Sequence, residues 1–334
     1  MDITYVVAGR LTRDYILPPV GLPLLDAPGG SGLYACGGVR SWQDRVGLMA
    51  RVGEDYPRRW LKELDTQGVD TAGVTVLEQD VDVRAFCAYD TNLQSTRSSP
   101  VSQFARRKLA FPKGLLGYQT PSEASSDARR PDVLAPSALE IPVPYREALA
   151  VHLCPLDLTS HVQLANAFRA SSANTLTVDP SPAYMKPQFM RDMRALLAGV
   201  SAFFPSEEEL RALFWGQTYD LWQMLSAVGE FGCEIVVAKR GGQGQAVLDV
   251  EGKHKWEIPA YPARLADPTG AGDAYCGGFL AGLKTTYDPL QAALYGNVAA
   301  SLAVEGSGAL YALGVAPGLA EARLSVMNDL VREV

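Results

Sequence analysis

The most informative segment of this sequence reads Asp267-Pro268-Thr269-Gly270-Ala271-Gly272-Asp273-Ala274-Tyr275 and continues as Cys276-Gly277-Gly278-Phe279-Leu280-Ala281-Gly282. Glycines that turn tightly at the start of a helix leave backbone N–H groups uncovered, and the helix dipole adds positive potential there. The segment therefore predicts an anion site at a helix N-terminus. Asp273 falls in the first turn, where a carboxylate can take a proton from a substrate hydroxyl beside a bound phosphate. A glycine-rich turn with Asp273 as a helix cap is the simpler explanation of these four residues taken alone.

On the N-terminal side of this segment, short apolar segments alternate with longer helical patterns. Strands are predicted at 3–8, 46–52, 150–154, 175–178, 202–204 and 235–238, and helices at 29–42, 56–67, 160–170, 187–197 and 207–214. Such alternation predicts an α/β fold in which a mostly parallel sheet is covered by helices on both faces.

Composition narrows the class of protein. The chain has 334 residues, of which 47% are hydrophobic and 20% charged, so it can build a large core and is not disordered throughout. Its 37 acidic residues against 30 basic ones give a net charge of -7, which argues against a general nucleic-acid binder. The five scattered cysteines form no C-x-x-C pair, and no segment approaches the roughly 18 uninterrupted apolar residues of a membrane span. We therefore expect a cytoplasmic protein with reduced thiols.

One part of the sequence breaks the alternation. Residues 97–146 are rich in Ser, Pro, Arg and Gln and show little periodicity, which predicts an irregular insertion within the domain. Within it we expect 121–130 to be mobile, because this part lacks apolar anchors.

The segment around Asp273 resembles the C-terminal signature of the ribokinase-like (pfkB-type) carbohydrate kinase family, D-T-x-G-A-G-D followed by a small-residue helix. Further segments resemble other parts of the family pattern in the same order along the chain. They are Val6-Val7-Ala8-Gly9 to Asp14, Gly29-Gly30-Ser31-Gly32, Arg51-Val52-Gly53-Glu54-Asp55, Pro205-Ser206-Glu207-Glu208-Glu209, Lys239-Arg240-Gly241-Gly242-Gln243-Gly244, and Asn297 to Gly308.

The resemblance implies one ribokinase-like domain over 1–334, with a three-layer fold and a small β lid. Lid elements are expected at about 10–28 and 80–100, beside the insertion at 97–146. The implied activity is ATP-dependent transfer of the γ-phosphate to a hydroxymethyl group of a sugar-like acceptor. A homodimer formed through the lid is compatible with the resemblance.

The same resemblance assigns roles at the reacting centre. Asp273 would be the general base, and the backbone of Gly270, Ala271 and Gly272 would hold the charge on the transferred phosphoryl group. Lys239, Gly241, Gly244 and Asn297 would bind the nucleotide.

Acceptor and metal residues follow from the other segments. Asp14, Gly29, Gly30 and Tyr34 would hold the acceptor, because a carboxylate accepts two hydroxyl groups and glycines let a polyol approach the backbone. Glu209 would orient Mg2+. Asp267 and Thr269 would lie near a monovalent cation such as K+ in those members that have one. From the residues alone, Asp14 is equally a strand-end turn residue, and Glu209 equally part of a solvated acidic helix start.

Three residues depart from the family pattern. Ser206 replaces the Asn of P-N-x-x-E, which weakens the metal assignment. Tyr34 replaces an Asn that contacts the substrate in many sugar kinases, which removes an amide and adds a stacking face. Lys239-Arg240 is more basic than usual before the glycines.

These departures keep several alternatives open. A nucleoside kinase of the same fold is the nearest one, because Tyr34 could stack on a base. A non-catalytic ligand-binding member has no need of Asp273. A hydrolase with an Asp nucleophile would need a D-x-D pair, but position 269 is Thr.

Overall fold

The structure is a computed structural model that describes residues 3–120, 128–316 and 318–334. Its strands are β1 (Tyr5–Ala8), β2 (Thr12–Leu17), β3 (Leu24–Gly29), β4 (Val46–Val52), β5 (Val69–Val76), β6 (Arg84–Tyr89), β7 (Ser95–Thr96), β8 (Ala150–Leu153), β9 (Thr175–Val178), β10 (Ala202–Phe203), β11 (Ile235–Lys239), β12 (Gln245–Asp249), β13 (Lys255–Ile258) and β14 (Arg332–Glu333). Its α-helices are α1 (Ser31–Arg40), α2 (Arg58–Thr66), α3 (Pro100–Arg106), α4 (Leu158–Arg169), α5 (Met190–Leu197), α6 (Glu207–Leu213), α7 (Leu221–Gly229), α8 (Ala271–Thr286), α9 (Pro289–Ala303), α10 (Ala309–Leu313) and α11 (Leu319–Met327).

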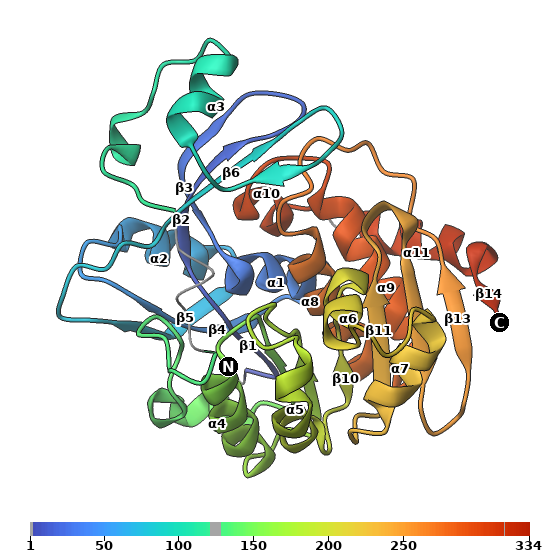
Figure 1. Cartoon of the computed structure of the whole chain (residues 1–334). Coiled ribbons are helices and arrows are strands. Elements are labelled where there is room, and N and C mark those ends of the chain that lie inside the picture. The colour runs from blue at the N-terminus through green and yellow to red at the C-terminus, as the bar shows by residue number, and fades with distance from the viewer. Residues whose placement is uncertain (1–2, 121–127, 317) are drawn as a thin grey trace.

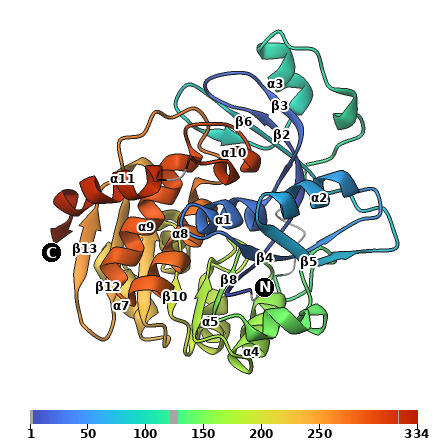
Figure 2. The same ribbon diagram turned by 180° about the vertical axis from the view of Figure 1, so that it is seen from behind.

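The main sheet has the strand order β14-β13-β12-β11-β10-β9-β8-β1-β4-β5. The strands from β11 to β5 in this order are parallel, and β12, β13 and β14 extend the sheet antiparallel. Helices α4 to α7 lie in front of this sheet in Figure 1, and α1, α2, α8 and α9 lie in front of it in the reverse view of Figure 2. The predicted α/β fold with helices on both faces is therefore confirmed.

Alternating residues along a strand point to opposite faces of the main sheet and pack into two different hydrophobic cores. In β1, Val6 and Ala8 pack into the core beneath α4 and α5, while Tyr5 and Val7 pack into the core beneath α1. All four residues of this strand are buried. A strand that is covered on both faces has no solvent-facing side, which is why β1 is a continuous apolar run.

Small residues let α1 and α8 approach each other closely. A Cβ atom on Gly277 would lie 1.9 Å from the carbonyl oxygen of Ala35, and one on Gly38 would lie 2.0 Å from that of Ala274. Larger side chains would push the helices apart, so these glycines place the start of α8 against α1.

A second, small sheet of order β3-β2-β6-β7 stands apart from the main sheet at the top of Figure 1. One of its faces packs on α3 and on the short 3₁₀ turn Lys113–Leu115 through a core of Tyr15, Leu17, Phe86 and Phe104. Arg107 fastens this cover by donating to the backbone carbonyls of Pro18, at 2.7 Å, and Tyr89.

The prediction that 97–146 is irregular throughout was wrong in its first part, which contains α3. Only Phe104 of α3 is buried, so the sequence carries no helical period there. Of the segment expected to be mobile, residues 121–127 lie outside the described residues.

Candidate active site

The candidate site lies at the carboxyl ends of the parallel strands, the edge at which open α/β sheets bind ligands. Asp179 directly follows β9, Ser206 follows β10, and Lys239 ends β11. Ser206 and Lys239 form an isolated parallel β-bridge, so these two chain segments lie side by side.

The turn before α8 has the geometry of an anion site. Gly270 has φ of 75°, in the left-handed region that favours glycine, and α8 begins at the next residue. The N–H of Ala271 already donates to the carbonyl of Pro268 at 3.2 Å. Within the described part of the chain, the N–H groups of Gly270, Gly272 and Asp273 have no backbone acceptor. Of the three donors expected to form the anion hole, those of Gly270 and Gly272 are therefore open and that of Ala271 is taken, while the N–H of Asp273 adds a further open donor.

Asp273 is only partly exposed, in the first turn of α8. Burial, followed by the negative charge of Asp179, raises the pKa of Asp273 to about 7, although the positive charges of Lys239 and Arg97 oppose the shift. A carboxylate with a pKa near neutrality is well suited to act as a general base.

Asp14 and the paired glycines form a second part of the site. Asp14 is 5% exposed, and Thr12 donates a hydrogen bond of 2.5 Å to it. A Cβ on Gly29 would lie 1.8 Å from an oxygen of the Asp14 carboxylate, so only glycine fits there. Burial raises the pKa of Asp14 to about 6. Gly30, with φ of 101°, is the N-cap residue of α1.

Tyr34 lies between these two parts. Its ring is 3% exposed and packs against Gly270, where an added Cβ would lie 2.0 Å from the ring. Because the ring is covered, the structure gives no support to a stacking face at Tyr34, and its role toward an acceptor stays a prediction. Its hydroxyl has no hydrogen-bond partner in the described residues. Burial, and then the charge of Asp14, raises the pKa of Tyr34.

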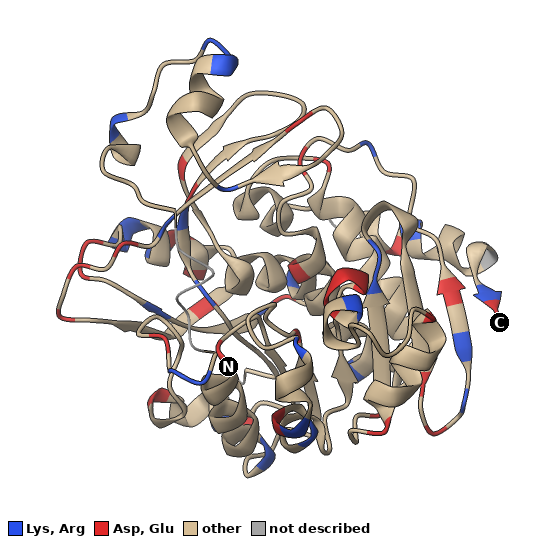
Figure 3. Ribbon diagram, in the orientation of Figure 1, with Lys and Arg blue, Asp and Glu red and all other residues tan. Residues whose placement is uncertain are grey.

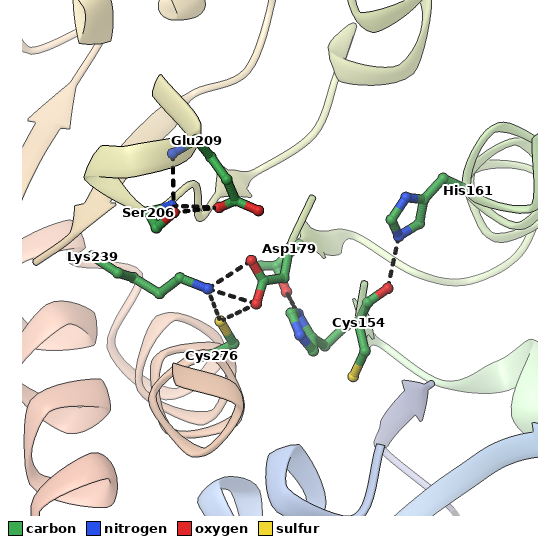
Figure 4. Close-up of polar contacts among 9 residues, drawn as sticks. Cys154, His161, Asp179, Ser206, Glu209, Lys239 and Cys276 are labelled. Atoms are coloured by element: carbon green, nitrogen blue, oxygen red, sulfur yellow. Dashed lines mark hydrogen bonds and ion pairs between the residues drawn. The ribbon is translucent and has the colours of Figure 1, made fainter. Parts of the chain in front are cut away.

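A buried ion pair lies beneath the start of α8. The ammonium of Lys239 is 2.6 Å from each carboxylate oxygen of Asp179, which is 3% exposed. Figure 4 shows both groups facing the sulfur of Cys276, which lies 3.6 Å from the Asp179 carboxylate. Burial alone would lower the pKa of Lys239, but the neighbouring Asp179 carboxylate raises it, and the lysine is therefore charged.

Glu209 is held by the start of its own helix. Its carboxylate accepts from the backbone N–H of Ser206 at 2.7 Å and from the Ser206 hydroxyl at 2.8 Å, while its own N–H donates back to that hydroxyl at 3.2 Å. This capping box explains how Ser can stand in the P-N-x-x-E motif. Burial, and then the charge of Asp179, raises the pKa of Glu209. Glu208 is exposed, so the solvated start that we considered for this helix applies to Glu208 and not to Glu209.

Asp267 and Thr269 lie in a different place from Glu209. Asp267 is fully buried; one carboxylate oxygen accepts from the N–H of Thr269 at 2.9 Å, and the other has no partner in the described residues. The Thr269 hydroxyl donates to the hydroxyl of Tyr89 on β6 at 3.0 Å. The three residues grouped as metal ligands are therefore divided between two locations.

The predicted nucleotide residues form two structures. Gly241–Gln243 is a 3₁₀ turn after β11, in which Gly241 has φ of 54° with open space around its Cα. A Cβ on Gly244 would lie 2.1 Å from the carbonyl of Ile258. The Asn297 amide accepts from the N–H of Tyr261 at 2.9 Å and donates to the carbonyl of Pro259 at 2.8 Å, so it holds the segment after β13.

The sequence analysis did not predict four residues that the structure places at the site. Asp179 could have been found, because it directly follows a predicted strand, and parallel sheets bind ligands at the carboxyl ends of their strands. Arg97 carried no such signal: it is exposed just after β7, and its charge lowers the pKa of both Asp14 and Asp273. Tyr89 and Thr12 are recognised only through their contacts in the small sheet.

Comparisons with known proteins identify the class of this chain as the small-molecule kinases. Residues 142–313 match the family model described as pfkB family carbohydrate kinase, and the chain belongs to that family. It is 26% identical over 282 residues to the cytidine kinase of Thermococcus kodakarensis, covering 83% of this chain and 87% of the relative. It is 27% identical over 278 residues to the fructokinase of Klebsiella pneumoniae, covering 80% of each chain.

Solved structures agree with this fold. A structure described as ribokinase II from E. coli, in complex with ATP and Mg2+, superposes with a TM-score of 0.68 at 17% identity and covers 98% of this chain and 99% of that one. None of the helices in residues 3–120, 128–316 and 318–334 has the length and hydropathy needed to span a membrane. Acidic and basic residues are interspersed along the ribbon in Figure 3.

Proposed function

We propose that this protein transfers the γ-phosphate of ATP to a hydroxymethyl group of a sugar or sugar-like acceptor. The proposal rests chiefly on Asp273, a partly buried carboxylate with a pKa near 7 that adjoins the open N–H groups of Gly270 and Gly272. A base and an anion site on the same helix turn are what phosphoryl transfer to an alcohol requires.

The transfer is one in-line displacement. The acceptor oxygen forms a bond to the γ-phosphorus, and the bond from that phosphorus to the β–γ bridging oxygen breaks. The acceptor proton passes to the carboxylate of Asp273, and ADP leaves. The open N–H groups of Gly270, Gly272 and Asp273 stabilise the charge on the transferred group.

The acceptor would lie between Asp14 and Asp273. The Asp14 carboxylate keeps one oxygen free of Thr12, and Gly29 and Gly30 leave room for a polyol against the backbone. The small sheet that carries Asp14 would act as a lid that keeps water from the phosphoryl group. A homodimer through this sheet stays a prediction.

The nucleotide would lie along Gly241–Gln243, Gly244 and Lys239, beside the segment that Asn297 holds. The oriented carboxylate of Glu209 fits Mg2+, a hard cation that takes oxygen ligands and keeps part of its water. Bound there, Mg2+ would neutralise charge on the phosphates. One oxygen of the fully buried Asp267 carboxylate has no partner in the part of the chain that the structure describes, and it fits a monovalent cation such as K+.

A coupled assay of ATP consumption tests the function. Fructose, ribose, other pentoses and hexoses, polyols, cytidine and other nucleosides are supplied one at a time with Mg2+ and ATP. We expect one acceptor class to be consumed, and phosphorus NMR of the product to show a primary phosphate ester. ATP binding without consumption in the presence of any acceptor would instead indicate a non-catalytic member.

A nucleoside acceptor is the second candidate. It is favoured by the cytidine kinase relative, which matches over most of both chains. The covered ring of Tyr34 gives it no support. Preferential phosphorylation of cytidine over fructose and ribose in the same screen would select this candidate.

Gly241→Val is expected to weaken ATP binding at least tenfold. A branched side chain would occupy the open space beside the loop and would strain the left-handed backbone, which costs about 1–2 kcal/mol by itself. Gly199→Val is the matched control, because Gly199 has φ of 73° and open space but lies at the opposite end of β10. Calorimetry with ATP distinguishes the two. Equal losses in both variants would mean that strain alone is responsible.

The pH dependence of kcat/KM is expected to follow two carboxylates. Asp273 must be ionised to accept a proton, so activity should fall as pH drops through about 7. Asp14 must be ionised to accept two hydroxyl groups, so the fall should steepen below about pH 6. A pH–rate profile from 5 to 9 checks this. Asp14→Asn should lose the steeper limb and keep the limb near 7; a flat profile down to pH 5 would contradict both assignments.

A further inference from the structure

Two departures from the family pattern are neighbours in space. Ser206 and Lys239 form the β-bridge that joins the ends of β10 and β11, and the N–H of Lys239 donates to the carbonyl of Pro205 at 2.8 Å. One departure replaces an amide of the expected metal motif, and the other places a lysine beside it. Figure 4 shows the Lys239 side chain extending from this bridge toward Asp179, below Glu209.

The charges around Lys239 are predominantly negative. Asp179 is paired with it, and the negative charge of Glu209 also acts on it. Asp273 experiences the Lys239 charge in turn. The other positive charge that acts on Asp273, Arg97, is exposed on the small sheet. Lys239 is therefore a partly buried cation within this site.

The lysine ammonium also lies beside the open donors of α8. It is 3.7 Å from the point where a Cβ of Gly272 would stand, and Gly272 is exposed. A lysine has three N–H donors, and two of those of Lys239 are accounted for by the Asp179 oxygens. Among the described residues, the third meets only the sulfur of Cys276 at 3.9 Å, which is a weak acceptor. One strong donor is therefore left for an anion at the start of α8.

We propose that Lys239 is a catalytic residue that contacts the transferred phosphoryl group and neutralises its developing charge. The metal motif of this chain lacks the amide that would otherwise contribute to this task, because Ser206 stands in its place. Asp179 is the positioning residue that holds the ammonium beside Gly272. A buried ion pair adds little net stability compared with an apolar pair of the same size, so stability does not account for it. The inference rests on the proposed kinase activity. It assigns to Lys239 the role of stabilising the transition state in place of holding ATP in the ground state.

The test compares a ground-state ligand with a transition-state analogue in the full chain. Calorimetry measures the Kd of ADP with Mg2+, and then of ADP with Mg2+ and aluminium fluoride, whose planar fluoride complex imitates the transferred group. The variants are Lys239→Met, Lys239→Arg and, as a matched loss of one charge, Lys62→Met on the exposed face of α2.

We expect fluoride to tighten ADP binding to the wild type and to Lys62→Met alike. Lys239→Met should bind ADP within about threefold of the wild type but lose roughly 100-fold of the tightening, the scale for one lost transition-state donor. Lys239→Arg should recover part of it. Because Lys239→Met leaves Asp179 unpaired, the double variant Lys239→Met/Asp179→Asn carries the same test if the single variant unfolds.

The possible failures are distinguishable. Full tightening in Lys239→Met or in the double variant would overturn the role of Lys239 while leaving the kinase proposal intact. A wild type that binds ADP without any tightening would also overturn it. A wild type that binds no ADP at all would overturn the proposed function itself.

Discussion

Asp273→Asn is expected to lower kcat by about 10²-fold or more, the scale for loss of a general base. The amide cannot take the acceptor proton, but it has nearly the same shape and leaves the open N–H groups of Gly270 and Gly272 in place. ATP affinity, measured by calorimetry, should therefore stay close to that of the wild type. Wild-type turnover in this variant would show that another group removes the proton.

The same variant should be more stable than the wild type at alkaline pH. The pKa of Asp273 is raised from its usual 3.8 to about 7, so the folded protein binds this proton more tightly than the unfolded chain does. Ionised Asp273 therefore destabilises the fold above about pH 7, and this penalty disappears below about pH 4. Urea unfolding at pH 8 and at pH 4 measures the difference. Greater stability together with lost turnover would distinguish a catalytic carboxylate from a structural helix cap, whose loss destabilises the fold.

Lys239→Met is expected to destabilise the fold by about 3–5 kcal/mol, because it leaves the buried Asp179 without its partner. The double variant Lys239→Met/Asp179→Asn removes both charges and should recover most of that loss. The control Lys62→Met, on the surface, should change the free energy of unfolding by less than about 0.5 kcal/mol.

The loss of folding stability in Lys239→Met should also depend on pH. Burial already raises the pKa of Asp179, and removing the lysine charge raises it further. A protonated Asp179 no longer needs a cation, so the destabilisation should be smaller at pH 5 than at pH 8. Urea unfolding of the single and double variants at both pH values checks this. A loss that is equal at both would mean that packing, not charge, dominates the effect.

The sequence predicted the layers of the fold because its signal is local. Strand β1 and the first four residues of β11 are runs of apolar residues, and such runs already indicate burial on both faces. The start of α8 was equally readable, since Gly270 with positive φ and the small residues after it mark a tight turn into a close-packed helix. Helix α3 escaped, because a single buried Phe104 produces no periodicity.

The individual residues of the site were less readable, because their roles depend on partners far away in the chain. Glu209 looks the same in sequence whether it is solvated or turned back onto Ser206, and only the capping hydrogen bonds decide it. Tyr34 looked like a stacking surface, yet its ring is 3% exposed and packs against Gly270. Both polar atoms of the Asn297 amide form hydrogen bonds with backbone groups of residues 259–261.

From the sequence alone came the α/β class, the helix N-terminus with Asp273 in its first turn, and the resemblance that groups the remaining motifs. Each of these follows from residues adjacent in the chain, where steric and hydrogen-bonding preferences act directly. Only the tertiary structure places Lys239 next to Asp179 and Gly272. It also raises the pKa values of Asp14 and Asp273. Charge interactions and desolvation depend on distance and burial, and these exist only once the strands are paired and the helices packed.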